Sequence, residues 1–149
     1  MARKKANPDK KGSPGYSAKL EDVENVISDN KNVLLNFEAC MIEDNKITGC
    51  CDGCDYYHGL IEGVVKEKKS RVEPLHIILD PRDPDDQKTA KRFNIDTWPS
   101  LIAFKDGQEV KRVSPVDFPR TKSPEADKLT ADIKNITEAL QFVEKSQEA

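Results

Sequence analysis

Two short apolar segments, residues 33–38 and 74–79, constrain the fold of this chain more than any other feature. Their length suits buried strands, because a helix that covers a core is usually longer. Between them the apolar spacing predicts an amphipathic helix that starts at Cys51 and ends at the charged run beginning with Lys66. Two strands joined through a helix lie parallel in one sheet. The sequence therefore predicts an α/β fold with a parallel pair of strands.

The rest of the chain adds elements on both sides of this unit. Apolar spacing predicts helices over residues 18–27, 85–93 and 129–144 and strands over residues 101–104 and 109–113. The two late strands meet across Asp106-Gly107, a pair that is typical of tight hairpin turns. Residues 40–50 and 114–124 are predicted as loops. We expect a central mixed sheet of four or five strands flanked by helices.

Composition narrows the class of protein. The chain has 149 residues, 36% hydrophobic and 34% charged, which suits one modest core with a well-solvated surface. No window has the 18 or more apolar residues of a membrane span, and the start of the chain has no apolar stretch of the kind that a secretory signal needs. We expect a disordered basic tail over residues 1–16 and one domain over residues 17–146. Without an apolar span or signal we expect no membrane contact and a cytoplasmic location, and because the body is acidic we expect no nucleic-acid partner.

The cysteines are concentrated in one part of the chain. Cys40, Cys50, Cys51 and Cys54 all lie within 15 residues. The disulfides of a small secreted scaffold spread along the whole chain, and a domain of this length does not need them. The clustering therefore points to local chemistry, either thiol redox or metal binding.

Cys51-Asp52-Gly53-Cys54 opens the helix that follows the first strand. A thiolate at a helix N-terminus is stabilised by free backbone N–H groups and by the helix dipole. Cys51 is therefore predicted to be the nucleophile that forms a mixed disulfide with a substrate, and Cys54 the thiol that resolves it. The carboxylates of Asp52 and Asp55 oppose the dipole at this position.

Three segments resemble the thioredoxin family: residues 33–39 its central strand, residues 51–54 its active site, and residues 93–107 its proline loop and hairpin. The resemblance extends over about residues 18–145 and implies a thioredoxin fold and a thiol–disulfide oxidoreductase. It also implies that Pro99 is the family's cis-proline and that Trp98 and Pro99 position the substrate opposite the cysteines. A proline is the residue before which a cis peptide costs little.

The same resemblance implies the partners of the reaction. These partners are protein disulfide substrates and a thioredoxin reductase or another dithiol donor. The protein itself is expected to be a monomer. It implies no cofactor beyond the Cys51–Cys54 disulfide and no bound metal.

The chain departs from the family at the active site, where Cys50 replaces the usual Trp and Asp52-Gly53 the frequent Gly-Pro, and at two positions that concern proton transfer. Asn36 stands where thioredoxins have a buried Asp for proton transfer, and His76 stands where they have the paired Lys. Because Asn36 cannot titrate, proton transfer would fall to His76 or to water. The alternative is that His76 is a core histidine whose hydrogen bonds are satisfied.

The chain is also longer between the first strand and the active site. Ala39 and Cys51 are twelve residues apart, against about three in thioredoxins, so about nine residues are inserted. Cys40 and Cys50 could form a second disulfide that exchanges electrons with Cys51 and Cys54. Alternatively, Cys40 is a small buried apolar residue at the end of a strand.

Two other classes of function stay open at this stage. Cys40, Cys50, Cys51 and Cys54, with His58, could bind zinc or an iron–sulfur cluster, although adjacent cysteines suit one ion poorly. The domain could also be a thioredoxin-like interaction module without catalysis.

Overall fold

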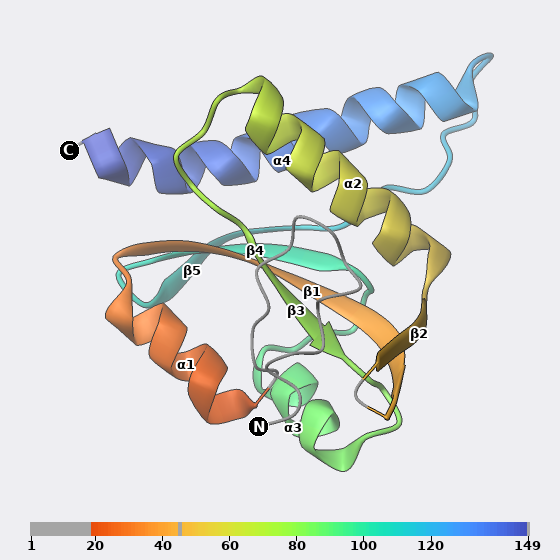
Figure 1. Cartoon of the computed structure of the whole chain (residues 1–149). Helices are drawn as coiled ribbons and strands as arrows, with labels where there is room; N and C mark the ends of the chain where they lie inside the picture. Colours follow the sequence, from red (N-terminus) through yellow and green to blue (C-terminus); the bar gives the residue numbers. More distant parts are fainter. Residues whose placement is uncertain (1–18, 45, 149) are drawn as a thin grey trace.

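The computed structural model describes residues 19–44 and 46–148, so the predicted tail over residues 1–16 lies outside the described part. The described chain forms one five-stranded sheet with helices on both faces (Figure 1). The elements in chain order are α1 (Leu20–Asp29), β1 (Asn32–Glu43), β2 (Lys46–Cys50), α2 (Asp52–Glu67), β3 (Leu75–Leu79), α3 (Pro84–Arg92), β4 (Ser100–Lys105), β5 (Gln108–Val113) and α4 (Pro124–Glu148). The predicted mixed sheet of an α/β fold is confirmed.

Strand β1 is central because it pairs with three others. It runs parallel to β3, with Asn36 opposite His76, and antiparallel to β4, with Phe37 opposite Ser100. β5 extends the sheet beyond β4 through the predicted hairpin. Asp106 and Gly107 in its turn have φ angles of 51° and 81°, as a turn with two left-handed residues requires. The β1–α2–β3 crossover is therefore the parallel unit that the sequence predicts.

The prediction of a loop over residues 40–50 is wrong. β1 continues to Glu43, turns, and pairs with β2 in an antiparallel hairpin that places Cys40 opposite Cys50. Asp44 in the turn has a φ of 50°. Most side chains of this hairpin are exposed, so no apolar run marks its strands in the sequence. The insertion therefore lengthens the central strand beside the active-site helix.

The last helix begins earlier than predicted. It starts at Pro124 rather than Leu129 and ends at Glu148. Proline is compatible with the first helical turn, where its missing N–H group would have no partner within the helix. The predicted loop over residues 114–124 is shortened only at its end.

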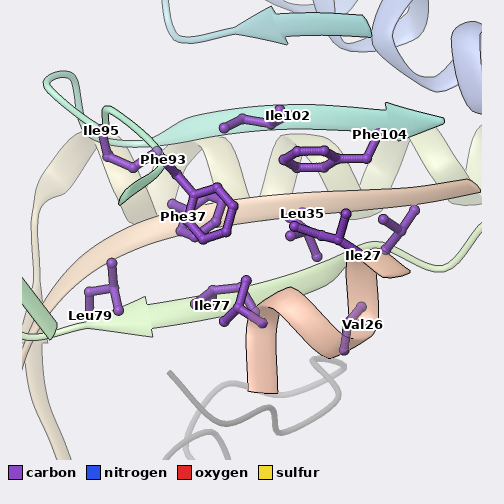
Figure 2. Packing of buried hydrophobic residues seen from close by; sticks show 12 residues of the cluster. Val26, Ile27, Leu35, Phe37, Ile77, Leu79, Phe93, Ile95, Ile102 and Phe104 are labelled. Carbon is purple, nitrogen blue, oxygen red and sulfur yellow. The ribbon is translucent and has the colours of Figure 1, made fainter. Parts of the chain in front are cut away.

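The helices pack in two layers. α1 and α3 cover one face of the sheet, and α2 and α4 cover the other (Figure 1). Figure 2 shows the core on the α1 side, where Leu35 and Phe37 of β1 pack with Ile77 of β3 and Phe104 of β4. No helix in the described ranges has both the length and the apolarity to cross a bilayer.

Side chains alternate between the two faces along β1. Leu35 and Phe37 point toward α1, so Asn36, Glu38 and Cys40 point toward α2. Leu34 on that second face packs into the core formed with α2 and α4. A polar row and a cysteine thus lie next to each other beneath the active-site helix.

Asp80 fastens the inserted hairpin to the end of β3. Its buried carboxylate accepts hydrogen bonds from the Ile42 N–H at 2.9 Å and from the Arg82 N–H at 2.9 Å. The Arg82 guanidinium donates to the same carboxylate, with Nη2 at 2.9 Å from Oδ2. The side-chain bond to Arg82 holds the pKa of Asp80 well below its usual range, although burial opposes this. This carboxylate therefore links strands β1 and β3 while it is ionised.

We predict that Asp80→Asn lowers the free energy of unfolding by about 2 kcal/mol at neutral pH, since hydrogen bonds to a charged group are lost. Because folding lowers the pKa of Asp80, its contribution is fully present above the unfolded carboxyl pKa of about 4 and declines progressively as the pH falls from there toward the much lower pKa of the folded state. Urea denaturation from pH 7 to pH 3 measures this. The control is Asp85→Asn, since Asp85 is exposed on α3; equal stabilities of the two variants at pH 7 would contradict the prediction.

Candidate active site

Cys51 and Cys54 lie at the start of α2. Cys51 is the N-cap residue, and its Sγ accepts the Cys54 N–H at 3.1 Å. Cys54 is fully buried and its Sγ accepts the Ala39 N–H at 3.4 Å, whereas Cys51 is partly exposed. The two sulfurs form a disulfide across Cα atoms 5.1 Å apart. The more accessible sulfur is thus the one at the helix N-terminus, which favours its role as nucleophile.

The Trp98–Pro99 segment lies against the active-site turn. Its peptide bond is cis. A Cβ on Gly53 would lie 3.8 Å from Pro99 Cδ and 3.9 Å from the Trp98 carbonyl oxygen. Pro99 is buried and Trp98 is partly exposed. The fold therefore brings together the two segments that the sequence singles out, although they are more than forty residues apart.

Cys40 and Cys50 form a second disulfide across the β1–β2 hairpin, with Cα atoms 3.9 Å apart. Cys40 is 2% exposed, and Cys50 is partly exposed. The two disulfides are adjacent, because Cys50 precedes Cys51 and the Cys51 N–H donates to the Ala39 carbonyl at 3.2 Å. With all four cysteines paired in this way, the structure does not favour a zinc or iron–sulfur site made of four thiolates.

A buried polar cluster lies under α2. The Glu38 carboxylate is 2.6 Å from His58 Nδ1 and 3.1 Å from His76 Nδ1, all through Oε2. The Asn36 amide nitrogen lies 3.0 Å from both Glu38 Oε2 and His76 Nδ1. His76 Nε2 is 2.8 Å from Glu62 Oε2, on the α2 side. Asn36 and His76 therefore lie in contact with each other. The buried carboxylate of Glu38, which the sequence does not single out, contacts both of them.

His76 is held by carboxylates on both of its ring nitrogens. Burial by itself lowers the pKa of His76, but the hydrogen bonds to Glu38 and Glu62 and their charges outweigh it and raise the pKa above its ordinary value. A Glu38 carboxylate oxygen also lies within 4.8 Å of the sulfurs of Cys40 and Cys50. The polar cluster therefore extends, through Glu38, to the Cys40–Cys50 disulfide.

The sequence analysis does not identify Glu38 or Glu62 as site residues. Glu38 is fully buried. In the sequence it is a charged residue at the end of an apolar run, a position that is typical of the exposed end of a strand. Two patterns point to it: the alternation that puts Glu38 on the face of Asn36, and the i, i+4 spacing of His58 and Glu62 on α2. Neither pattern is interpretable until α2 is placed over β1.

A shallow apolar groove of about 510 Å³ opens beside the active-site turn. It extends from Asp52 and Gly53 to Phe118 and Leu129, whose exposed fractions are 64% and 42%. Lys128 lies over the Phe118 ring, 5.6 Å from its centroid. The groove therefore presents apolar surface directly next to the cysteine motif.

Asp132 on α4 fixes the loop that forms this groove. Its buried carboxylate accepts from the Val116 N–H at 2.8 Å, the Tyr56 hydroxyl at 2.8 Å and Lys128 Nζ at 3.1 Å. Burial and the hydrogen bond to Asp132 raise the pKa of Tyr56 to about 12. The Tyr56 hydroxyl therefore remains a donor at neutral pH, and it ties α2 to α4 beside the groove.

Curated relatives of the chain are thioredoxins. The chain is 31% identical over 88 residues to thioredoxins of Mycobacterium tuberculosis strain H37Rv and of Mycobacterium bovis, in an alignment that covers 59% of this chain and 65% of those proteins. The chain thus spans just under two thirds of the length of these relatives. No protein-family profile matches it.

Solved structures of thioredoxins share the fold. The reduced Schistosoma mansoni thioredoxin pre-protein has a TM-score of 0.53 at 19% identity and covers 85% of this chain and 95% of its own. The oxidised Plasmodium falciparum thioredoxin has a TM-score of 0.51 at 15% identity, with coverages of 85% and 94%. Mitochondrial thioredoxin 3 of Saccharomyces cerevisiae gives 0.52 at 16% identity, with coverages of 81% and 91%. At such identities the likeness is one of fold.

The disulfide pairing can be tested by counting free thiols in double Cys→Ser variants after oxidation. We predict none in Cys51→Ser/Cys54→Ser, where Cys40 and Cys50 remain, and none in Cys40→Ser/Cys50→Ser. The crossed variant Cys40→Ser/Cys54→Ser leaves Cys50 and Cys51, which pair with different partners in the structure. We predict two free thiols there, and two free thiols in either matched variant would contradict the pairing.

Proposed function

We propose that the chain is a thioredoxin-family thiol–disulfide oxidoreductase that exchanges protein disulfides through Cys51 and Cys54. The observation that carries the proposal is the geometry of α2: an accessible sulfur caps the helix, and a buried sulfur lies three residues further on. Exchange needs this asymmetry, since one thiol must be accessible to attack the substrate disulfide and the other reacts only with the mixed disulfide that results.

In the proposed reaction the Cys51 thiolate attacks one sulfur of a substrate disulfide. A Cys51–substrate bond forms, the substrate S–S bond breaks, and the second substrate sulfur leaves as a thiolate that takes a proton from water. The Cys54 thiolate then attacks Cys51 Sγ, closing the Cys51–Cys54 disulfide and releasing the first substrate sulfur. The substrate gains two electrons and the cysteine pair loses two.

The return of the cysteine pair to the dithiol requires an electron donor. We propose a thioredoxin reductase or another dithiol donor, because the relatives are thioredoxins. The pair needs no further cofactor for this exchange. The monomeric state and the cytoplasmic location stay predictions from the sequence.

Trp98 and Pro99 are proposed to position the substrate. Both lie against Gly53, so a chain that places its disulfide at Cys51 passes over them. The apolar groove with Phe118 and Leu129 lies on the neighbouring side of the same turn. We propose that it receives an apolar side chain of the protein substrate.

Asn36 and His76 are proposed as positioning residues. Asn36 contacts Glu38 and His76, and His76 also contacts Glu38 and Glu62. They hold the Glu38 carboxylate behind the hairpin disulfide, and the partly exposed Cys51 exchanges its proton with water. Cys40 and Cys50 are proposed as a disulfide that keeps the β1–β2 hairpin closed beside the site.

Substitution of the two active-site cysteines tests the function. The protein should accelerate the reduction of a protein disulfide such as that of insulin by dithiothreitol, and Cys51→Ser should abolish this acceleration. Cys54→Ser should accumulate a mixed disulfide with the substrate, because resolution is lost. Cys40→Ser/Cys50→Ser is the matched control and should keep activity; equal rates for Cys51→Ser and the unsubstituted protein would refute the proposal.

The groove is tested by truncating its most exposed side chain. We predict that Phe118→Ala raises KM for a protein disulfide about tenfold and leaves kcat unchanged, because an apolar contact made equally in the bound substrate and the transition state is removed. Phe142→Ala is the control, since Phe142 is also exposed but lies in the C-terminal part of α4, away from Phe118 and Leu129 in the sequence. A matching increase in KM for both variants would contradict a specific role of the groove.

A further inference from the structure

Glu38, His58 and His76 form a buried group that takes no part in the bond-making and bond-breaking steps of the proposed thiol exchange. One carboxylate oxygen and one nitrogen from each imidazole all lie within 4.8 Å of one another. The exposed fractions of the three residues are 0%, 8% and 0%. We infer that this group binds one divalent transition-metal ion of the zinc class, through Glu38 Oε2, His58 Nδ1 and His76 Nδ1. The inference is independent of the proposed exchange reaction.

The donor atoms already converge. Glu38 Oε2 is 2.6 Å from His58 Nδ1 and 3.1 Å from His76 Nδ1. Zinc–ligand bonds of about 2.0 Å at tetrahedral angles place donors about 3.3 Å apart. The imidazole rings lie face to face, with centroids 3.8 Å apart and planes 31° apart, and both turn Nδ1 toward Glu38. An ion therefore fits once Glu38 Oε2 moves about 0.7 Å further from His58 Nδ1 and about 0.2 Å further from His76 Nδ1.

The outer partner of His76 provides a second, separate sign. His76 Nε2 lies 2.8 Å from Glu62 Oε2, and the Glu62 side chain is 34% exposed at the α2 surface. A histidine that binds a metal through one nitrogen typically donates its other N–H to a carboxylate, which fixes the ring and its tautomer. Glu62 is in the place that this arrangement requires.

Asn36 supplies an unused oxygen at the same place. Its amide nitrogen is 3.0 Å from Glu38 Oε2 and 3.0 Å from His76 Nδ1, while its Oδ1 is buried and without a hydrogen-bond partner. A buried polar atom without a partner costs free energy. Half a turn of the amide would direct Oδ1 toward the ion as a fourth ligand.

Charge favours the same conclusion. Two carboxylates, Glu38 and Glu62, flank His76 in a largely buried cluster. A divalent ion balances both charges while both imidazoles stay neutral, which is the form that binds metal. Two nitrogens and one carboxylate suit zinc and neighbouring transition metals, whereas calcium and magnesium prefer oxygen ligands alone.

Of these three residues only His58 is a candidate metal ligand from the sequence, and there it joins the four cysteines rather than Glu38 and His76. Glu38, His58 and His76 come from β1, α2 and β3, and only the β1–α2–β3 crossover brings them together. Since a Glu38 oxygen also lies within 4.8 Å of the Cys40 and Cys50 sulfurs, reduced thiolates would compete as ligands. The test therefore uses the oxidised protein, in which both disulfides are closed.

The experiment titrates Zn²⁺ into the oxidised, metal-free full-length protein by calorimetry, with Co²⁺ absorption as a report on ligand type. We expect one Zn²⁺ per chain and a Co²⁺ spectrum without thiolate bands. His58→Gln should weaken Zn²⁺ binding at least about 100-fold, and Glu62→Gln about 10- to 100-fold through the loss of its outer hydrogen bond. Glu67→Gln, an exposed carboxylate on the same helix, should bind as the unsubstituted protein does.

Several results would overturn the inference. They are the absence of stoichiometric Zn²⁺ binding, equal affinities for His58→Gln, Glu62→Gln and Glu67→Gln, or thiolate bands in the Co²⁺ spectrum. If His58→Gln fails to fold, Glu62→Gln still decides the question, since the Glu62 carboxylate is partly exposed. Cys51→Ser/Cys54→Ser, which has no free thiol once Cys40 and Cys50 are oxidised, should bind Zn²⁺ normally, so loss of the exchange activity and loss of the metal site are separable.

Discussion

The alternation of side chains along β1 determines where both the core and the site lie. One set of positions, with Leu35 and Phe37, fills the core against α1 and α3. The other set carries Asn36, Glu38 and Cys40 toward α2. A shift of one residue in the pairing of β1 would exchange the two sets and bury polar groups in the apolar layer. The parallel register with β3, which places Asn36 opposite His76, therefore fixes the site as well as the sheet.

The hairpin insertion changes what surrounds the cysteine motif. It continues β1 past Ala39, closes through the Cys40–Cys50 disulfide and is tied to β3 by Asp80. Cys50, the residue directly before Cys51, is therefore the last residue of a strand that is held by a disulfide and is not part of a loop. The buried carboxylate of Glu38 lies between this hairpin and the two histidines. A disulfide cysteine, Cys40, and a residue of the buried polar cluster, Glu38, thus lie two residues apart on β1.

The sequence predicts the elements that carry strong apolar periodicity and the motifs with fixed spacing. The β1–α2–β3 crossover, the Asp106-Gly107 hairpin and the position of Cys51 at a helix start all follow from local patterns. The 40–50 hairpin does not, because its strands are mostly exposed and lack an apolar run. The Glu38 cluster is also inaccessible to local reasoning, since its members lie on three elements and interact only after packing. Long-range polar contacts are set by tertiary register, which no single segment encodes.

The central claim is that Cys51 is the reacting thiol of the pair. The most direct measurement is the rate at which each thiol of the fully reduced protein is alkylated by iodoacetamide at neutral pH, followed by peptide mass spectrometry. We predict that Cys51 is modified first and that Cys54, which is fully buried behind it, is modified slowest. Faster modification of Cys54 than of Cys51 would contradict the assignment of nucleophile and resolving thiol.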